Sequence, residues 1–191
     1  MRYRNSALVW AIVAVNVAVF IMTTARPDIA NYLAVTKPIY QGHYWTILTA
    51  MFVHADFSHI LLNMLTLYFF GTLCLQLIDK KWFLLVYFVG GIVGNLLFLL
   101  IGPMYSAAVG ASGAIFALGG VLAMMRPKLR VYLYFLIPMP LWLGIIIGFL
   151  LTAFVAGIAW QAHLGGLAVG LIVGFILRRR ERRGANPGYY R

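Results

Sequence analysis

The chain has 191 residues, of which 63% are hydrophobic and only 10% are charged. Soluble domains carry roughly 25% charged residues, so this composition excludes an ordinary water-soluble domain and favours a protein of the lipid bilayer. The single cysteine, Cys74, excludes an internal disulfide, and the net charge of +11 does not indicate a nucleic-acid partner, because the basic residues fall in short clusters between apolar runs.

Six apolar runs follow one another along the chain. They are expected to form transmembrane helices near residues 7–24, 57–77, 82–101, 111–125, 141–158 and 161–177. A helix needs about 20 residues to cross the hydrocarbon core, with a range of about 17–25, so the fourth run is short. The predicted fold is an all-α membrane protein, a bundle of six transmembrane helices that forms a single domain over residues 1–191.

The connections between these runs differ in character. Residues 25–56 contain tyrosines and tryptophans, which favour the headgroup zone, so a loop lying partly in the outer interface is expected. Residues 127–140 contain Pro138 and Pro140, which interrupt helices, and are expected to form a connecting or interfacial segment. The basic residues 178–191 are expected to form a cytoplasmic tail held at lipid headgroups.

Positive charge is distributed unevenly between the two sides of this predicted bundle. With a cytoplasmic N-terminus, all of the 15 basic residues except Arg26 and Lys37 fall on the inner side. Because basic residues near transmembrane segments stay preferentially in the cytoplasm, both termini are predicted to be cytoplasmic, with an even number of spans. The expected location is the plasma or inner membrane, as an integral multi-pass protein.

Three polar side chains within the predicted helices lie at nearly one depth. Counted from the basic residue that ends each helix, Asn63, Ser112 and His163 lie roughly 21–25 Å above the inner boundary, at about 1.5 Å per residue. All three therefore fall in the outer third of a core about 30 Å thick. An amide, a hydroxyl and an imidazole at one level, from three different helices, indicate a single site.

The short fourth run indicates where this site lies. It would reach only about 22 Å, so the preceding residues 102–110 would be non-helical backbone at membrane depth, which is tolerated only beside protein or a water-filled cavity. Ser112 lies near the start of the run, where free backbone N–H groups favour a developing negative charge. Gly110 and Gly113 leave room there for a substrate backbone.

The sixth run carries small residues on the face that holds its histidine. His163, Gly166 and Gly170 lie on one side of the helix, which favours close helix packing in lipid. Packed against the fourth run, this face would bring His163 to Ser112, with Phe116 stacked under the imidazole. No acidic residue lies in the middle of a predicted span, so the imidazole is expected to be oriented by packing rather than by a carboxylate.

Each of these residues also has a purely structural interpretation. Ser112 would be a packing or capping residue, His163 a buried histidine bonded to a carbonyl, and Asn63 a bridge between helices. Asp56 is expected to cap the second helix, and Cys74 is expected in the core.

Cofactor and transport functions find little support. His54 and His59 do not share a helix face well, and only Asp56 lies near them, so no metal site is expected. The missing intramembrane acids and the lack of an internal repeat disfavour a small transporter or channel.

Three motifs resemble those of the rhomboid family of intramembrane serine proteases. GASG around Ser112 resembles the GxSG of that family, and AHLGG around His163 resembles its AHxxG. His54, His59 and Asn63 resemble its HxxxxHxxxN. The resemblance runs from about residue 42 to residue 174 and implies the minimal six-helix form.

The resemblance implies a role for each matched residue. Ser112 would be the nucleophile and His163 the general base of a Ser–His dyad. The oxyanion hole would comprise Asn63, His59 and the Ser112 backbone N–H, whereas His54 would be structural. Supporting roles are implied for the remaining members of the site: Gly110, Gly113, Phe116, Gly166 and Gly170.

The implied function is cleavage of transmembrane segments of other membrane proteins near the outer leaflet, at a site open to the non-cytoplasmic side and without a cofactor. The alternative is a catalytically silent rhomboid-like protein that binds transmembrane helices for traffic or quality control. One departure concerns the outer loop, where many family members have Trp-Arg and this chain has Trp45 followed by Thr46. Stabilisation of the loop by that arginine is therefore absent here. The sequence leaves open the oligomeric state and the choice of loop 25–56 or the fifth span as a gate.

Overall fold

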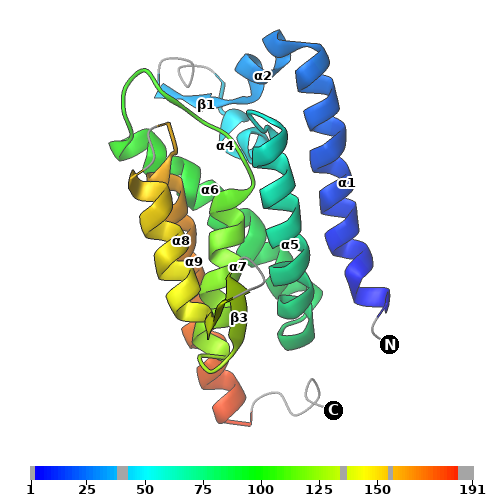
Figure 1. The fold of residues 1–191 in the computed structure, drawn as a ribbon, viewed down its shortest axis with the longest axis vertical. Helices are drawn as coiled ribbons and strands as arrows, with labels where there is room; N and C mark the ends of the chain where they lie inside the picture. The colour runs from blue at the N-terminus through cyan, green and yellow to red at the C-terminus, as the bar shows by residue number, and fades with distance from the viewer. Residues whose placement is uncertain (1–2, 38–42, 134–136, 155–156, 185–191) are drawn as a thin grey trace.

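The structure is a computed structural model that describes residues 3–37, 43–133, 137–154 and 157–184. Six helices form a bundle (Figure 1): α1 (Tyr3–Ala25), α5 (Phe57–Leu77), α6 (Lys80–Ile101), α7 (Ser112–Met125), α8 (Leu141–Phe154) and α9 (Trp160–Arg182). The short elements are α2 (Pro27–Leu33), α4 (Thr46–Thr49), the 3-10 helix η1 (Ala50–Phe52), β1 (Val35–Thr36), β2 (Ala107–Ala108), β3 (Arg130–Leu133) and β4 (Ile137–Pro140).

Helix length separates the bundle into two groups. Among the described residues, α5, α6, α9 and residues 6–25 of α1 are long and apolar enough to cross a bilayer. Helices α7 and α8 are apolar but have 14 residues each, which corresponds to about 21 Å and is less than the hydrocarbon core. A helical protein of the membrane is therefore confirmed, whereas the number of crossings stays a prediction.

Helix α1 begins at Tyr3, four residues before its predicted start, and the C-terminal ends of two further helices differ from those predicted. Helix α8 is described as far as Phe154, and residues 157 and 158 are not helical, so the helix does not reach its predicted end at residue 158. Gly157 has a φ of 84°, which a right-handed helix does not accommodate. Helix α9 continues to Arg182, past the predicted end at residue 177, because arginine is a good helix former and is favoured near a helix C-terminus. The first part of the predicted basic tail is thus helical.

Two small antiparallel sheets correct the expectation of a purely helical fold. Strands β3 and β4 pair from Arg130 with Pro140 to Leu133 with Ile137, within the segment expected only to be a connection. In a two-stranded ribbon each strand is an edge, so a proline without an N–H is tolerated there. Strands β1 and β2 form the second pair.

The residues before α7 are covered by the outer loop. Strand β1 lies in loop 25–56 and pairs with β2, with Val35 opposite Ala108. The Gly110 N–H donates to the Ala50 carbonyl at 2.9 Å, and Ala108 and Ala111 are buried. These contacts satisfy backbone groups of the non-helical stretch just before Ser112, which is the condition for such backbone at membrane depth.

Loop 25–56 is held in place without the Trp-Arg pair. Trp45 Nε1 donates to the Tyr32 carbonyl at 3.2 Å, and the Thr49 hydroxyl donates to the Leu33 carbonyl at 2.9 Å. From the bundle, Asn95 Nδ2 on α6 donates to the Ile47 carbonyl of α4 at 2.8 Å. The loop is therefore anchored both internally and to α6.

Glycines bring α6, α7 and α9 together backbone to backbone. A methyl group on Gly166 of α9 would overlap the Gly113 carbonyl of α7, and one on Gly170 would overlap the Ala117 carbonyl. A methyl group on Gly94 of α6 would overlap the Ala162 carbonyl of α9 in the same way. Because lipid supplies no hydrophobic driving force between helices, this close approach sets how the three helices pack.

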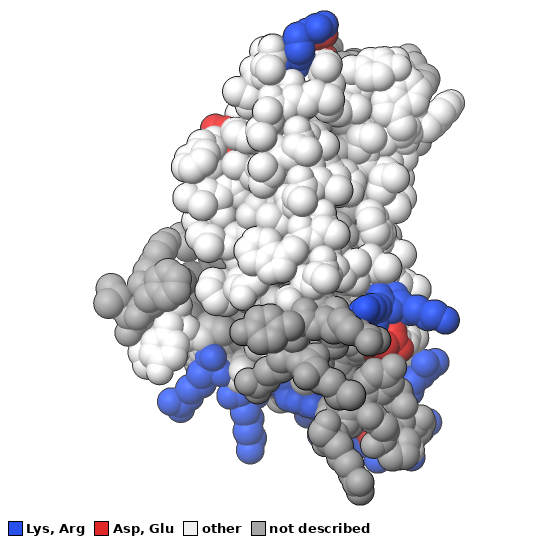
Figure 2. Space-filling view, turned by 90° about the vertical axis from the view of Figure 1, so that its right-hand side faces the viewer, with Lys and Arg blue, Asp and Glu red and all other residues white. Residues whose placement is uncertain are grey.

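One end of the bundle is rich in basic residues and holds both the start of α1 and the end of α9. Helix α1 begins and α9 ends at the same end (Figure 1). On the face shown in Figure 2, lysine and arginine side chains gather mainly at that lower end, below a broad band without acidic or basic residues. There Arg126 and Glu181 form an ion pair at 3.1 Å.

Candidate active site

The structure brings Ser112 and His163 into direct contact. Ser112 is the first residue of α7, and its Oγ lies 2.7 Å from Nε2 of His163 on α9. The imidazole is buried, with 5% of the residue exposed. The glycine contacts between α7 and α9 allow this distance, since Gly166 lies one turn beyond His163 and touches the backbone of Gly113.

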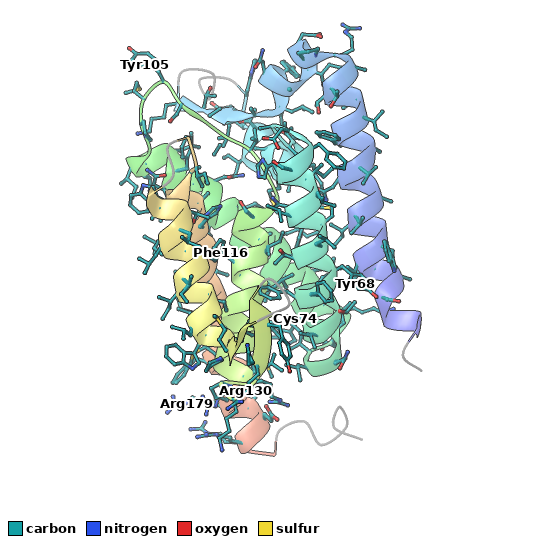
Figure 3. The ribbon with its side chains drawn as sticks, in the orientation of Figure 1. Tyr68, Cys74, Tyr105, Phe116, Arg130 and Arg179 are labelled. Atoms are coloured by element: carbon teal, nitrogen blue, oxygen red, sulfur yellow. The ribbon has the colours of Figure 1, made fainter. Side chains whose placement is uncertain are left out.

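Phe116 forms the floor under the histidine. Its ring stacks on the imidazole of His163, with centroids 4.7 Å apart and an interplanar angle of 26°. Phe149 of α8 packs edge-on against Phe116 at 6.3 Å. Figure 3 labels Phe116 between α7 and α8, far from Arg130 and Arg179 at the basic end and from Tyr105 at the opposite end.

Sequence reasoning missed Thr152. Its Oγ1 lies 3.0 Å from His163 Nδ1 and also donates to the Phe149 carbonyl at 2.9 Å. The expectation that packing alone orients the imidazole was therefore incomplete, because a hydroxyl contributes as well. The available signal was that Thr152 is the one hydroxyl in the apolar run 141–158.

His59 borders the serine from the other side. Its Nδ1 accepts the Ala55 N–H over 3.4 Å, so in the neutral ring Nε2 carries the proton. A methyl group placed on Gly110 would lie 2.7 Å from that Nε2 and 3.8 Å from Ser112 Oγ. Gly110 also has a φ of 115°, so a side chain there would be strained as well as crowded.

Asn63 lies on the same helix but is not joined to the dyad. It is buried, and its Nδ2 donates to the His59 carbonyl at 2.9 Å. Among the described residues no hydrogen bond links Asn63 to Ser112 or His163, and its Oδ1 has no partner. One amide N–H remains free for another acceptor.

His54 supports the start of α5 and is neutral. Its Nδ1 lies 3.3 Å from the Phe52 carbonyl, and its ring meets that of His59 edge-on at 5.0 Å. Burial, and then the neighbouring His59, lower the pKa of His54 to about 4. Asp56 caps α5 by accepting the His59 N–H at 2.8 Å, as predicted, and the Ser58 hydroxyl, followed by that N–H, lowers the pKa of its carboxyl.

A cavity of about 370 Å³ lies beside this region at the outer-loop end of the bundle. It is lined by Thr23 and Thr24 of α1, by residues of α2, by His54, and by Ala107 and Val109 just before the serine. Among the described residues, no group of three potential ligands could hold a metal ion.

The family model of the Rhomboid domain matches residues 41–180 of this chain. This chain belongs to the rhomboid family. YdcA of Bacillus subtilis is 33% identical over 146 residues, which cover 74% of this chain and 72% of that relative. RHOMBOID-like protein 12, mitochondrial, of Arabidopsis thaliana is 32% identical over 202 residues, covering 92% of this chain and 60% of the relative. Rhomboid protease GluP of Bacillus subtilis is 33% identical over 132 residues, which cover 69% of this chain and 26% of that relative.

Membership of the rhomboid family supports the conclusion that this chain is an integral membrane protein. At the level of the family, it also supports classification as a hydrolase. The predicted site residues all lie within the matched range, from His54 to Gly170, whereas α1 lies outside it. The chain spans about three quarters of YdcA but only 60% of the plant mitochondrial relative.

Proposed function

We propose that this rhomboid is an intramembrane serine endopeptidase that cleaves transmembrane segments of other membrane proteins. The observation that carries the proposal is the 2.7 Å separation of Ser112 Oγ and His163 Nε2. A serine hydroxyl becomes a nucleophile when a base within hydrogen-bond reach takes its proton, and no cofactor is needed. A purely structural serine does not require a buried histidine at this position.

The proposed reaction proceeds in two steps. His163 Nε2 takes the Ser112 proton as Oγ attacks the scissile carbonyl, and the bond to the leaving nitrogen breaks when His163 returns the proton to that nitrogen. Water then attacks the acyl-enzyme while His163 takes its proton, and the ester bond to Ser112 Oγ breaks as His163 returns that proton to Oγ. The stacked Phe116 holds the ring in one plane through both steps.

We propose that the oxyanion forms beside the start of α7. Among the described residues, neither the cap residue Ala111 nor another group accepts a hydrogen bond from the first N–H groups of α7, so these groups can stabilise negative charge. The protonated Nε2 of His59 borders the same space, and the free N–H of Asn63 is the third candidate donor. Removing one such donor typically costs about 10²–10³ in rate.

The substrate follows from the location of the site. Ser112 lies at the start of a short helix, on the outer-loop side of the bundle, beneath residues that pair with loop 25–56. A transmembrane helix shields its own backbone, so a substrate must unwind locally to reach Ser112. Segments with helix-breaking or small residues near the outer leaflet are therefore favoured.

The proposal is tested with a fluorophosphonate probe and a single-span reporter protein in liposomes. The wild type is expected to bind the probe covalently and to cleave the reporter, whereas Ser112→Ala does neither. Ser58→Ala is the matched control, because within the part of the chain that the structure describes the Ser58 hydroxyl bonds to Asp56 and not to the dyad. A wild type that ignores the probe but still binds the reporter would support instead a silent rhomboid-like protein for traffic or quality control.

We further propose that the six helices cross the membrane as one domain, with both termini in the cytoplasm. The shared end of α1 and α9, with its basic residues, supports this orientation (Figures 1 and 2). Tyr105 lies at the opposite end and is 94% exposed, and Lys128 is exposed at the basic end.

Cysteine labelling tests this topology in a Cys74→Ala background. Cys74 is fully buried, so the wild-type background is already low. A membrane-impermeant maleimide is expected to label Tyr105→Cys on intact cells and to label Lys128→Cys only after the membrane is opened. Labelling of both positions on intact cells would refute the arrangement.

A further inference from the structure

The hydroxyl of Thr152 has one proton and two close neighbours. That proton goes to the Phe149 carbonyl at 2.9 Å, since a carbonyl oxygen can only accept. With the proton assigned to the carbonyl, which can only accept, the hydroxyl oxygen accepts in its contact with His163 Nδ1 at 3.0 Å. It follows that Nδ1 of His163 carries a proton.

This assignment decides the state of the other ring nitrogen. A neutral imidazole has one N–H, so Nε2 is bare where it faces Ser112 Oγ at 2.7 Å. The hydrogen bonds then run in one direction, from Ser112 through His163 and Thr152 to the Phe149 carbonyl. In a chain of this kind each bond polarises the next.

No carboxylate is available for the same task. Each of the four acidic residues bonds elsewhere in the structure. The pairs are Asp28 with Arg26, Asp56 with Ser58, Asp79 with the Trp82 N–H, and Glu181 with Arg126. Among the described residues, Thr152 is the one side chain that hydrogen-bonds to Nδ1 of His163.

We propose that Thr152 is a positioning residue that selects the Nδ1–H tautomer of His163 and so keeps Nε2 ready to take the serine proton. This inference rests on the proposed function for its effect on rate, although the tautomer itself does not depend on that function. It also assigns a task to α8 through its one hydroxyl side chain. When Nε2 takes the proton, the same contact stabilises the cation, because its N–H keeps an acceptor.

The kinetic test compares Thr152→Val with Thr152→Ser. Valine keeps the shape and removes the hydroxyl, and it is expected to lower kcat on the single-span reporter about 10- to 100-fold while KM is unchanged, as for a hydrogen bond to a charged group. Serine restores the hydroxyl and is expected to restore most of kcat. Thr72→Val is the matched control, because Thr72 makes the same kind of bond to its own helix, to the Tyr68 carbonyl, away from the dyad.

A spectroscopic measurement separates this proposal from the proposed function. In protein labelled with nitrogen-15 histidine, with His163→Ala used for assignment, His163 is expected to show a protonated Nδ1 and a bare Nε2 in the wild type and in Thr152→Ser. In Thr152→Val this preference is expected to be lost. A wild type that shows this tautomer yet cleaves nothing would overturn the proposed function and leave the role of Thr152 standing. An unchanged tautomer in Thr152→Val, or a valine variant as active as Thr72→Val, would overturn the role of Thr152.

Discussion

Ser112→Ala and His163→Ala are each expected to lower kcat for the reporter by about 10³-fold or more, and the double variant is expected to lose no more than either single variant. In the proposed mechanism the two side chains, which lie 2.7 Å apart, act as one proton-transfer unit, so removing either member disables the other. Losses within such a unit are strongly non-additive. The measurement is kcat in liposomes for the wild type, both single variants and the double variant.

His43→Ala is the control for this series. His43 lies in the outer loop, where its ring stacks on Trp45 at 4.6 Å, and it makes no described contact with the dyad. It is expected to retain most of the activity. If the losses of the two single variants multiply in the double variant, then Ser112 and His163 act independently and the dyad is wrong.

Gly166→Ala is expected to lower both the melting temperature and kcat. The added methyl group would overlap the Gly113 carbonyl, so α9 must move away from α7. Overpacking of this kind typically costs about 1–3 kcal/mol. Because His163 lies one turn away on α9, a shift of about 1 Å is expected to cost about 10²-fold in kcat as well.

Gly148→Ala provides the same chemical change without the overlap. Gly148 lies on α8, and a methyl group there would meet no atom within 4 Å, apart from its chain neighbours and its own helix backbone. This variant is expected to match or slightly exceed the wild-type melting temperature, since alanine is the better helix former. Equal effects of Gly148→Ala and Gly166→Ala would show that the contact between α7 and α9 is not what positions His163.

Local patterns explain what could be predicted about the fold. Apolar runs predicted the helices of the bundle, because a helix in lipid hydrogen-bonds its polar backbone groups internally and presents apolar side chains to the lipid. The helix cap at Asp56 could also be predicted, since a capping residue and its helix are neighbours in sequence. The end of α8 and the β3–β4 hairpin could not be predicted, because apolar composition alone does not distinguish a helix from a short two-stranded sheet.

The residues of the candidate site likewise divide into those that local sequence patterns could predict and those that they could not. Ser112 and His163 could be placed together because their distances from the basic ends of their helices put them at one depth. Phe116 could be added because it lies one turn from Ser112 on the same helix face. Thr152 could not, since its partner belongs to the next helix, across a turn that local patterns do not define. The pairing of β1 with β2, which covers the backbone before Ser112, likewise joins segments that lie far apart in the chain.

The sequence by itself therefore indicated a protein of the lipid bilayer and a member of the rhomboid family, and it predicted Ser112 and His163 as the residues of the proposed dyad. Composition, charge placement and motif spacing are properties of the chain in order, and they survive without coordinates. Only the tertiary structure brings Thr152 to His163, and this contact carries our inference about the direction of the hydrogen bonds through the imidazole. Which ring nitrogen carries the proton depends on a hydroxyl that reaches the imidazole only when α8 packs beside α9.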